Sequence, residues 1–276
     1  MTKKLIFLDI DGTLTPAGSN VPPASALAAI RAAQQNGHKV FLCTGRNPDM
    51  LAPVLAYGFD GAVACAGGYV FAGDKVLFDC PMTDAQRDTA LRLLGEQGVF
   101  RTIEAADATF GDENLSEFLA QQDGGNSELV RWRKALAEKL NIRPMGEYDG
   151  RPIYKVVIMC NSAAQLIPAR QALEAEFDFV VQDVAAHNCL NGELINRKFD
   201  KGTGVRCVAR ALGIDLKDTI GFGDSMNDMA MIETVAYSVC MANGSPKVQE
   251  KSDLVCPAVE EDGLAWAFTR LGLTEK

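Results

Sequence analysis

The sequence lacks the features that would assign it to a membrane protein, a disulfide scaffold or a nucleic-acid binder. It has no predominantly apolar stretch of about 18 residues, so no transmembrane helix is expected. It has no CxxC pair, and most of its eight cysteines lie scattered in apolar runs, where a free cysteine behaves as a small buried hydrophobe. Its 27 Lys and Arg are outnumbered by 36 Asp and Glu, and the net charge of −9 argues against binding to nucleic acid or to an anionic membrane.

The start of the chain also lacks a complete targeting signal. Residues 1–4 include two lysines, but the apolar run Leu5–Leu8 is broken by Asp9 and Asp11 before an h-region forms. Because free cysteines indicate a reducing compartment, we expect a cytoplasmic protein. With 47% hydrophobic residues, the 276-residue chain can bury a sizeable core in one large domain or two smaller ones.

Short apolar runs alternate with helical patterns in the N-terminal and C-terminal parts of the chain. The predicted strands are Leu5–Ile10, Lys39–Cys43, Ala62–Cys65, Thr219–Phe222, Ser238–Met241 and Leu254–Val255. The predicted helices are Pro22–Gln35, Met50–Tyr57, Gly204–Leu212 and Met226–Val235. Because the apolar runs are continuous rather than alternating, they are typical of a parallel sheet that is covered on both faces.

The middle of the chain has a different character. Thr83 and Gln86 form a capping-box pattern that opens a helix to about Gln97. The other elements predicted there are helices at Ser127–Leu140 and from Pro168 to Glu176, and strands at Tyr154–Met159 and Phe179–Val181. We therefore expect an α/β protein with a doubly wound, parallel-sheet, Rossmann-like core formed by residues 1–80 and 193–276, and an inserted α+β domain at 81–192.

Two acidic segments follow predicted strands. In the first, DIDGT, Asp9 and Asp11 are two residues apart, so on a strand both side chains reach the same place beyond the carboxyl end of the sheet. In the second, GDSMND, Asp224 lies at a strand end, and Asn227 and Asp228 fall in the first turn of a helix. If the two strands are neighbours, Asp9 and Asp224 supply the hard oxygen ligands of a magnesium site.

Two further segments carry residue types that suit a phosphate. Thr44-Gly45-Arg46 follows the strand Lys39–Cys43 and offers a hydroxyl, backbone N–H groups beside a glycine, and a guanidinium. Taken alone, this segment is more typical of an ordinary polar turn. Lys201 precedes a predicted helix in KGTG, where a cation is mildly unfavourable unless an anion binds nearby.

These four segments, in this order, resemble the motifs of the haloacid dehalogenase superfamily of phosphohydrolases. The position of the insert, between the third strand and Lys201, resembles that of the cap in the type IIB, or Cof-like, subgroup. One turn departs from the subgroup, which often has Asn-Gly-Ala after the third strand, where this chain has Cys65-Ala66-Gly67-Gly68.

The resemblance implies a magnesium-dependent phosphatase that forms an aspartyl-phosphate. By that resemblance, Asp9 attacks phosphorus, and Asp11 protonates the leaving oxygen and later takes a proton from water. Mg²⁺ is held by the carboxylates of Asp9 and Asp224 and by the backbone carbonyl of Asp11, with Asp228 supporting the metal.

The phosphate-binding residues implied in the same way come from the other two segments. Thr44 and Lys201 hold the transferring phosphoryl oxygens, Gly45 and Arg46 belong to the same phosphate-binding turn, and Asn227 positions Lys201. The implied substrate is a small phosphorylated metabolite, such as a sugar phosphate, with the insert as its lid. Two alternatives remain open: a phosphomutase of a sugar phosphate, and a non-enzymatic module regulated by aspartate phosphorylation. His187, near the end of the insert, is either a substrate contact or a solvated loop histidine.

Overall fold

The computed structural model describes residues 3–120, 142–182 and 190–275. The chain forms two compact units, one of Met1–Asp79 with Phe199–Lys276 and the other of Cys80–Lys198. The helix predicted at Ser127–Leu140 and the histidine at 187 lie outside the described residues. In the part of the chain that the structure describes, no helix is long and apolar enough to cross a membrane.

The first unit is built on an eight-stranded sheet with the order β14-β13-β12-β1-β2-β3-β4-β5. Its strands are β1 (Leu5–Leu8), β2 (Lys39–Cys43), β3 (Gly61–Ala64), β4 (Tyr69–Ala72), β5 (Lys75–Asp79), β12 (Thr219–Gly223), β13 (Tyr237–Met241) and β14 (Leu254–Cys256). The run from β14 to β3 is parallel, which confirms the predicted sheet. The β4–β5 hairpin, which the sequence analysis did not assign, adds two antiparallel strands at one edge.

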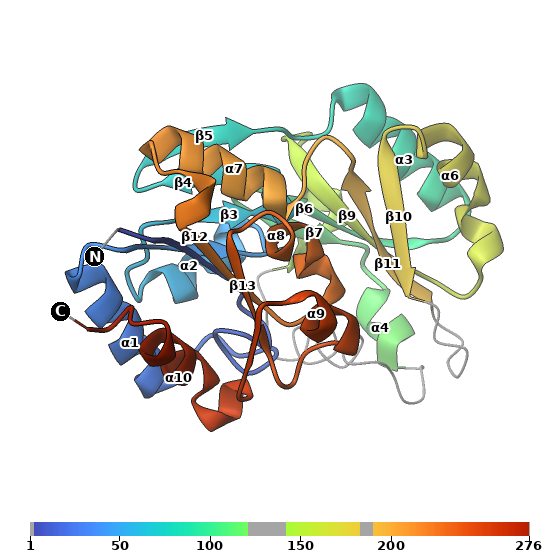
Figure 1. The fold of residues 1–276 in the computed structure, drawn as a ribbon. Coiled ribbons are helices and arrows are strands. Elements are labelled where there is room, and N and C mark those ends of the chain that lie inside the picture. Colours follow the sequence, from blue (N-terminus) through green and yellow to red (C-terminus); the bar gives the residue numbers. More distant parts are fainter. Residues whose placement is uncertain (1–2, 121–141, 183–189, 276) are drawn as a thin grey trace. The chain divides into compact units, whose positions relative to one another are not determined.

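Helices cover both faces of this sheet (Figure 1). They are α1 (Ala24–Gln35), α2 (Pro48–Leu55), α7 (Lys201–Leu212), α8 (Met229–Ile232), α9 (Pro246–Lys251) and α10 (Gly263–Arg270). On one face, Val205 of α7 and Met231 of α8 pack with Phe7 and Phe41 in one buried cluster. On the other, α1 lies against α10, and Phe268 of α10 contacts Phe222 with ring centroids 5.3 Å apart. The continuous apolar strands are buried on both faces for this reason.

The second unit has a six-stranded sheet with the order β10-β11-β9-β6-β7-β8. Its strands are β6 (Phe100–Ala105), β7 (Thr109–Gly111), β8 (Ile142–Pro144), β9 (Ile153–Cys160), β10 (Phe177–Gln182) and β11 (Leu190–Asn196), and its helices are α3 (Asp84–Glu96), α4 (Leu115–Ala120) and α6 (Ile167–Leu173). Thr83 Oγ1 accepts a hydrogen bond from Gln86 N, and Gln86 Oε1 accepts one from Thr83 N, so the capping box forms. Because β11 pairs with β9 and β10, this unit extends to Lys198, beyond the expected boundary at 192.

Two element boundaries differ from the sequence prediction in ways that shape the site. The predicted helix at 204–212 already begins at Lys201, because the Asp200 side chain accepts a hydrogen bond from Thr203 N at 2.6 Å and caps it. The predicted helix at 226–235 is shortened to α8, preceded by a 3-10 turn at Met226–Asp228. That turn is closed by the Asp228 carboxylate, as described below.

Candidate active site

The site lies at the carboxyl end of β1, where the order of the strands reverses. β1 pairs with β2, the next strand in the sequence, on one side, and with β12, which follows the second unit, on the other. Open α/β sheets bind ligands at such a switch point. The pairing of Leu8 with Phe222 brings the strand ends before Asp9 and Asp224 together, as a shared metal site requires.

The DIDGT segment forms a tight turn rather than a longer strand. β1 ends at Leu8, so the expected strand geometry for Asp9 and Asp11 is wrong. The chain instead wraps around the carbonyl of Ile10, which accepts hydrogen bonds from Thr13 N, Leu14 N and Thr15 N at 3.2, 3.0 and 2.9 Å. As a result, strand alternation does not fix the position of the Asp11 side chain.

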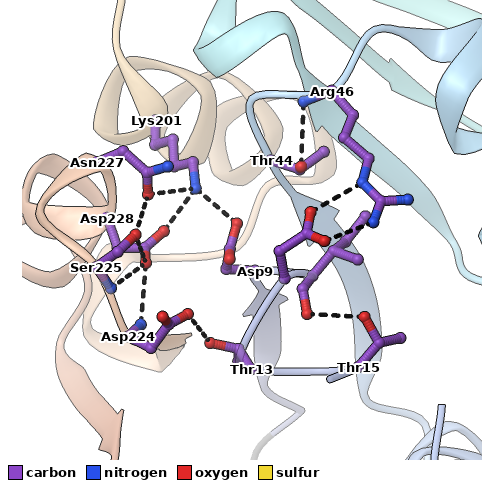
Figure 2. Close-up of polar contacts among 12 residues, drawn as sticks. Asp9, Thr13, Thr15, Thr44, Arg46, Lys201, Asp224, Ser225, Asn227 and Asp228 are labelled. Carbon is purple, nitrogen blue, oxygen red and sulfur yellow. Dashed lines mark hydrogen bonds and ion pairs between the residues drawn. The ribbon is translucent and has the colours of Figure 1, made fainter. Parts of the chain in front are cut away.

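Gly12 allows this turn to approach Asp224. Its φ of +90° suits glycine, and a Cβ there would lie 2.7 Å from Asp224 Oδ2. Thr13 Oγ1 donates a hydrogen bond to Asp224 Oδ1 at 2.8 Å (Figure 2). Asn243 Nδ2 supports the turn from outside by donating to Gly12 O at 2.8 Å. Sequence reasoning missed Asn243, whose only local signal is an Asn-Gly pair typical of a turn.

Lys201 points from the first turn of α7 into a group of acidic side chains (Figure 2). Its Nζ donates to Asp9 Oδ1 at 2.7 Å, to Asp228 Oδ1 at 2.5 Å and to Asn227 Oδ1 at 3.2 Å. The Lys201 side chain is only 1% exposed, and Asp228 is fully buried. The structure therefore brings together four of the residues that the sequence analysis selected.

Asp228 also shapes the backbone of the site. Its Oδ2 accepts hydrogen bonds from Asp224 N and Ser225 N, both at 3.0 Å. These bonds close the 3-10 turn at Met226–Asp228, which accounts for the later start of α8. Carboxylate oxygens of Asp9, Asp224 and Asp228 lie within 4.8 Å of one another. Three hard oxygen donors at this spacing fit a Mg²⁺ ion.

The electrostatics of this group are dominated by burial and by its excess of carboxylates. Burial, and then the charge of Asp228, raise the pKa of Asp9 well above its ordinary value. The same two causes raise the pKa of Asp224 to about 6. Burial alone would lower the pKa of Lys201, but Asp228 and Asp9 outweigh it and raise that pKa, so the ammonium stays charged. One ammonium does not balance three carboxylates, and a divalent cation would.

The segment Thr44-Gly45-Arg46 follows β2 as expected. Thr44 is buried, its N–H donates to Val63 O at 2.9 Å, and its Oγ1 accepts from Arg46 N at 3.2 Å. The Arg46 guanidinium, which belongs to the predicted phosphate-binding turn, forms a bidentate ion pair with the Asp11 carboxylate. The Arg46 guanidinium therefore contacts the other site residues through Asp11. Gly45 lies between Thr44 and Arg46 in the sequence.

The turn after β3, which departs from the Cof-like pattern, has an unusual backbone. Cys65 and Ala66 both have positive φ values, 51° and 57°. Their N–H groups donate to Arg46 O and Thr44 O, both at 2.9 Å. The turn thus holds the backbone of the Thr44 segment, at the cost of two residues in the left-handed region.

A Rossmann-like sheet with buried acids and a lysine at its switch point suits the chemistry of phosphoryl transfer. The chain belongs to the haloacid dehalogenase-like hydrolase family, whose model matches residues 6–268. The motif resemblance to the haloacid dehalogenase superfamily is confirmed by this match. The protein is accordingly a phosphatase.

Proteins similar to this chain in sequence and in structure match nearly its full length. The chain is 28% identical to YkrA of Bacillus subtilis strain 168, a protein named as a phosphatase, and the match covers 99% of both. It is 24% identical to a phosphoglycolate phosphatase of Methanothermobacter thermautotrophicus, over 97% of this chain and 98% of that one. A crystal structure of a Geobacillus kaustophilus HTA426 protein matches with a TM-score of 0.82 and 25% identity, covering 98% and 99% of the two chains. The subclass IIB sugar phosphatase BT4131 shares the fold, with a TM-score of 0.76 and 21% identity over 98% and 100%.

Proposed function

We propose that this phosphatase hydrolyses a small phosphomonoester in two steps, with Asp9 as the nucleophile and Mg²⁺ as the cofactor. The observation that carries the proposal is the buried carboxylate of Asp9, 2.7 Å from Lys201 and grouped with Asp224 and Asp228. A carboxylate can attack a phosphate anion only if nearby cations offset the repulsion. Lys201 supplies one such cation, and the grouped carboxylates would hold another.

The proposed metal ligands are the carboxylates of Asp9 and Asp224 and the backbone carbonyl of Asp11, with Asp228 in support. A bound Mg²⁺ would neutralise the carboxylates and draw a phosphoryl oxygen toward Asp9. The Thr13 hydroxyl would orient the Asp224 carboxylate. The backbone N–H groups of Asp224 and Ser225, which donate to Asp228 Oδ2, would fix the Asp228 carboxylate.

The chain's own residues account for both chemical steps. In the first, an Asp9 oxygen forms a bond to phosphorus as the bond to the leaving oxygen breaks, and Asp11 gives that oxygen a proton, which releases an alcohol. In the second, a water attacks phosphorus, the bond to Asp9 breaks, and Asp11 takes the proton from the water. Inorganic phosphate leaves, and both acids return to their starting states. Lys201, positioned by Asn227, and Thr44 hold the phosphoryl oxygens throughout.

The test is to trap the phosphoenzyme with an aryl phosphate in the wild type, Asp9→Asn and Asp11→Asn, with and without chelator. We expect an acid-stable, hydroxylamine-sensitive phosphoprotein in the wild type, none in Asp9→Asn, and partial transfer in Asp11→Asn, because a low-pKa leaving group needs little protonation. Chelator should abolish turnover. If Asp9→Asn is phosphorylated and Asp11→Asn is not, the two roles are reversed, and equal rates with chelator exclude the metal.

The substrate is proposed to be a sugar phosphate or a similar small metabolite. Relatives carry different substrate names, including phosphoglycolate and pyridoxal phosphate, so the shared fold leaves the substrate open. We propose that the second unit acts as the lid that selects it. Phosphate release from a panel of phosphorylated metabolites tests the substrate class, and release without a bisphosphate activator separates a phosphatase from a phosphomutase.

A further inference from the structure

The two acids of DIDGT have different cationic partners. Asp9 is bound by Lys201, whereas the Asp11 carboxylate accepts from Arg46 Nε at 2.9 Å and from Arg46 Nη2 at 2.8 Å. The N–H of Gly18 also donates to Asp11 Oδ1, at 3.0 Å. The paired side chains are largely buried, 14% exposed for Arg46 and 17% for Asp11. This is a bidentate pair with fixed geometry rather than a solvated surface contact.

Arg46 is itself fixed by the loop that follows the DIDGT turn. Its Nη1 donates to Asn20 Oδ1 at 2.6 Å, and its Nη2 donates to Ser19 O at 3.3 Å. Its backbone is tied on both sides, since Arg46 N donates to Thr44 Oγ1 and Arg46 O accepts from Cys65 N. The guanidinium therefore has one defined orientation, and it transmits that orientation to Asp11.

We propose that Arg46 is a positioning residue that orients the Asp11 carboxylate for hydrolysis of the phosphoenzyme, and that it releases Asp11 when this side chain protonates the leaving oxygen. The inference rests on the proposed function. Both Asp11 oxygens face N–H donors, so the arrangement suits an ionised carboxylate, which is the form left after the proton has gone to the leaving group. A carboxyl that carries a proton cannot keep the bidentate pair, because its O–H would face the N–H groups of Arg46.

This assignment fits the different demands of the two steps. Phosphoryl transfer passes through a loose transition state, so the attacking water needs accurate placement more than a strong base. A carboxylate held by both Arg46 nitrogens is well placed for this role. The leaving oxygen of an alkyl phosphate, by contrast, needs a proton, and for that step the ion pair must open.

The experiment is rapid-quench, single-turnover kinetics on the wild type, Arg46→Met and Arg46→Lys, with an aryl and an alkyl phosphate. We expect Arg46→Met to slow phosphoenzyme hydrolysis on the order of 10-fold or more, while phosphoenzyme formation is retained, so that the intermediate accumulates. Arg46→Lys should restore part of the hydrolysis rate, because an ammonium keeps the charge without the bidentate fork. Arg31→Met, on an exposed helix face, is the matched control and should leave both steps unchanged.

A double-mutant cycle with Asp11→Asn distinguishes this positioning role from direct binding of the phosphate by Arg46. If Arg46 acts through Asp11, Arg46→Met should add little to the hydrolysis defect of Asp11→Asn. Additive losses, or slower phosphoenzyme formation with both substrates and a raised KM, would mean that Arg46 binds the phosphate directly, and would overturn the proposal. If the wild type forms no phosphoenzyme at all, the proposed function fails instead. Arg46→Lys, which keeps the positive charge, keeps the test informative if Arg46→Met does not fold.

Discussion

At the scale of single residues, the site combines one buried ammonium with three carboxylates. Burial favours the neutral form of each acid, and neighbouring negative charge favours it further. Without a cation the protein therefore holds these acids in a costly arrangement. Hydrogen bonds nevertheless hold the carboxylates in place. The Thr13 hydroxyl donates to Asp224, and the backbone N–H groups of Asp224 and Ser225 donate to Asp228. Because the carboxylates repel one another in the folded state, we expect the free energy of unfolding to depend on pH and on bound metal.

The Asp224→Asn variant tests this link. In the metal-free fold the pKa of Asp224 is raised to about 6 from 3.8, so between these values the folded state binds more protons than the unfolded state. The free energy of unfolding should therefore fall as pH rises from about 4 to 6, by roughly 3 kcal/mol at most. Asp224→Asn should remove the part of this slope that Asp224 contributes, leaving the part due to Asp9, and should stabilise the metal-free protein at pH 7.

Thermal unfolding with and without Mg²⁺, at several pH values, measures the effect. The stabilisation of the wild type by Mg²⁺ should grow as pH rises through the same window, because the ligand must lose its proton. It should largely disappear in Asp224→Asn. The exposed Asp74→Asn is the control and should behave as the wild type. A pH slope between about 4 and 6 that is as steep in Asp224→Asn as in the wild type would show that Asp224 does not contribute.

The sequence predicts which residues belong to the site better than it predicts which side chains contact each other. Asp9, Lys201 and Asp224 stand out in the sequence because each follows or precedes an apolar element at a place where its charge is unfavourable alone. The Asp11–Arg46 pair could not be predicted in this way, because it depends on the turn around Ile10 and on the loop at residues 18–20. Neither has a repeating pattern that local sequence rules can detect.

At the scale of elements, the close packing of α7 on the sheet sets the position of Lys201. A Cβ on Gly204 would lie 2.2 Å from Val63 Cγ1 on β3, and one on Gly202 would lie 2.4 Å from Ala230 O. The helix can lie this close only because both positions are glycine. Sequence patterns predicted α7 and β3 correctly as elements, but they contain no signal for the distance between them.

Gly204→Ala should therefore push α7 away from β3 and move Lys201 from Asp9. We expect a loss of about 1–3 kcal/mol in the free energy of unfolding and a lower kcat. Val63→Ala in the same chain removes the methyl groups that the new Cβ would meet, and it should restore part of both. Urea unfolding and steady-state kinetics of the single and double variants measure this. A double variant no better than Gly204→Ala would locate the defect elsewhere.

At the scale of the whole molecule, the chain leaves the first unit at Asp79 and returns at Phe199. Two crossings suit a hinge, and hydrolysis needs water excluded in the first step and admitted in the second. We predict that an aluminium or beryllium fluoride mimic of the phosphoryl group changes the small-angle scattering profile in the presence of Mg²⁺. Asp9→Asn, which lacks the carboxylate that coordinates the mimic, should not respond. Identical wild-type profiles with an occupied site would argue against a moving lid.

The division of the first unit has a consequence for the order in which the site can be assembled on the ribosome. β1 and the DIDGT turn are made first, but β12 and α7, which carry the partners of Asp9, are made only after the entire second unit. Until then the β1 edge that later pairs with β12 has no neighbour, and Asp9 has neither Lys201 nor Asp224 beside it. During its synthesis, the chain therefore carries Asp9, the proposed nucleophile, without the side chains that surround it in the folded site.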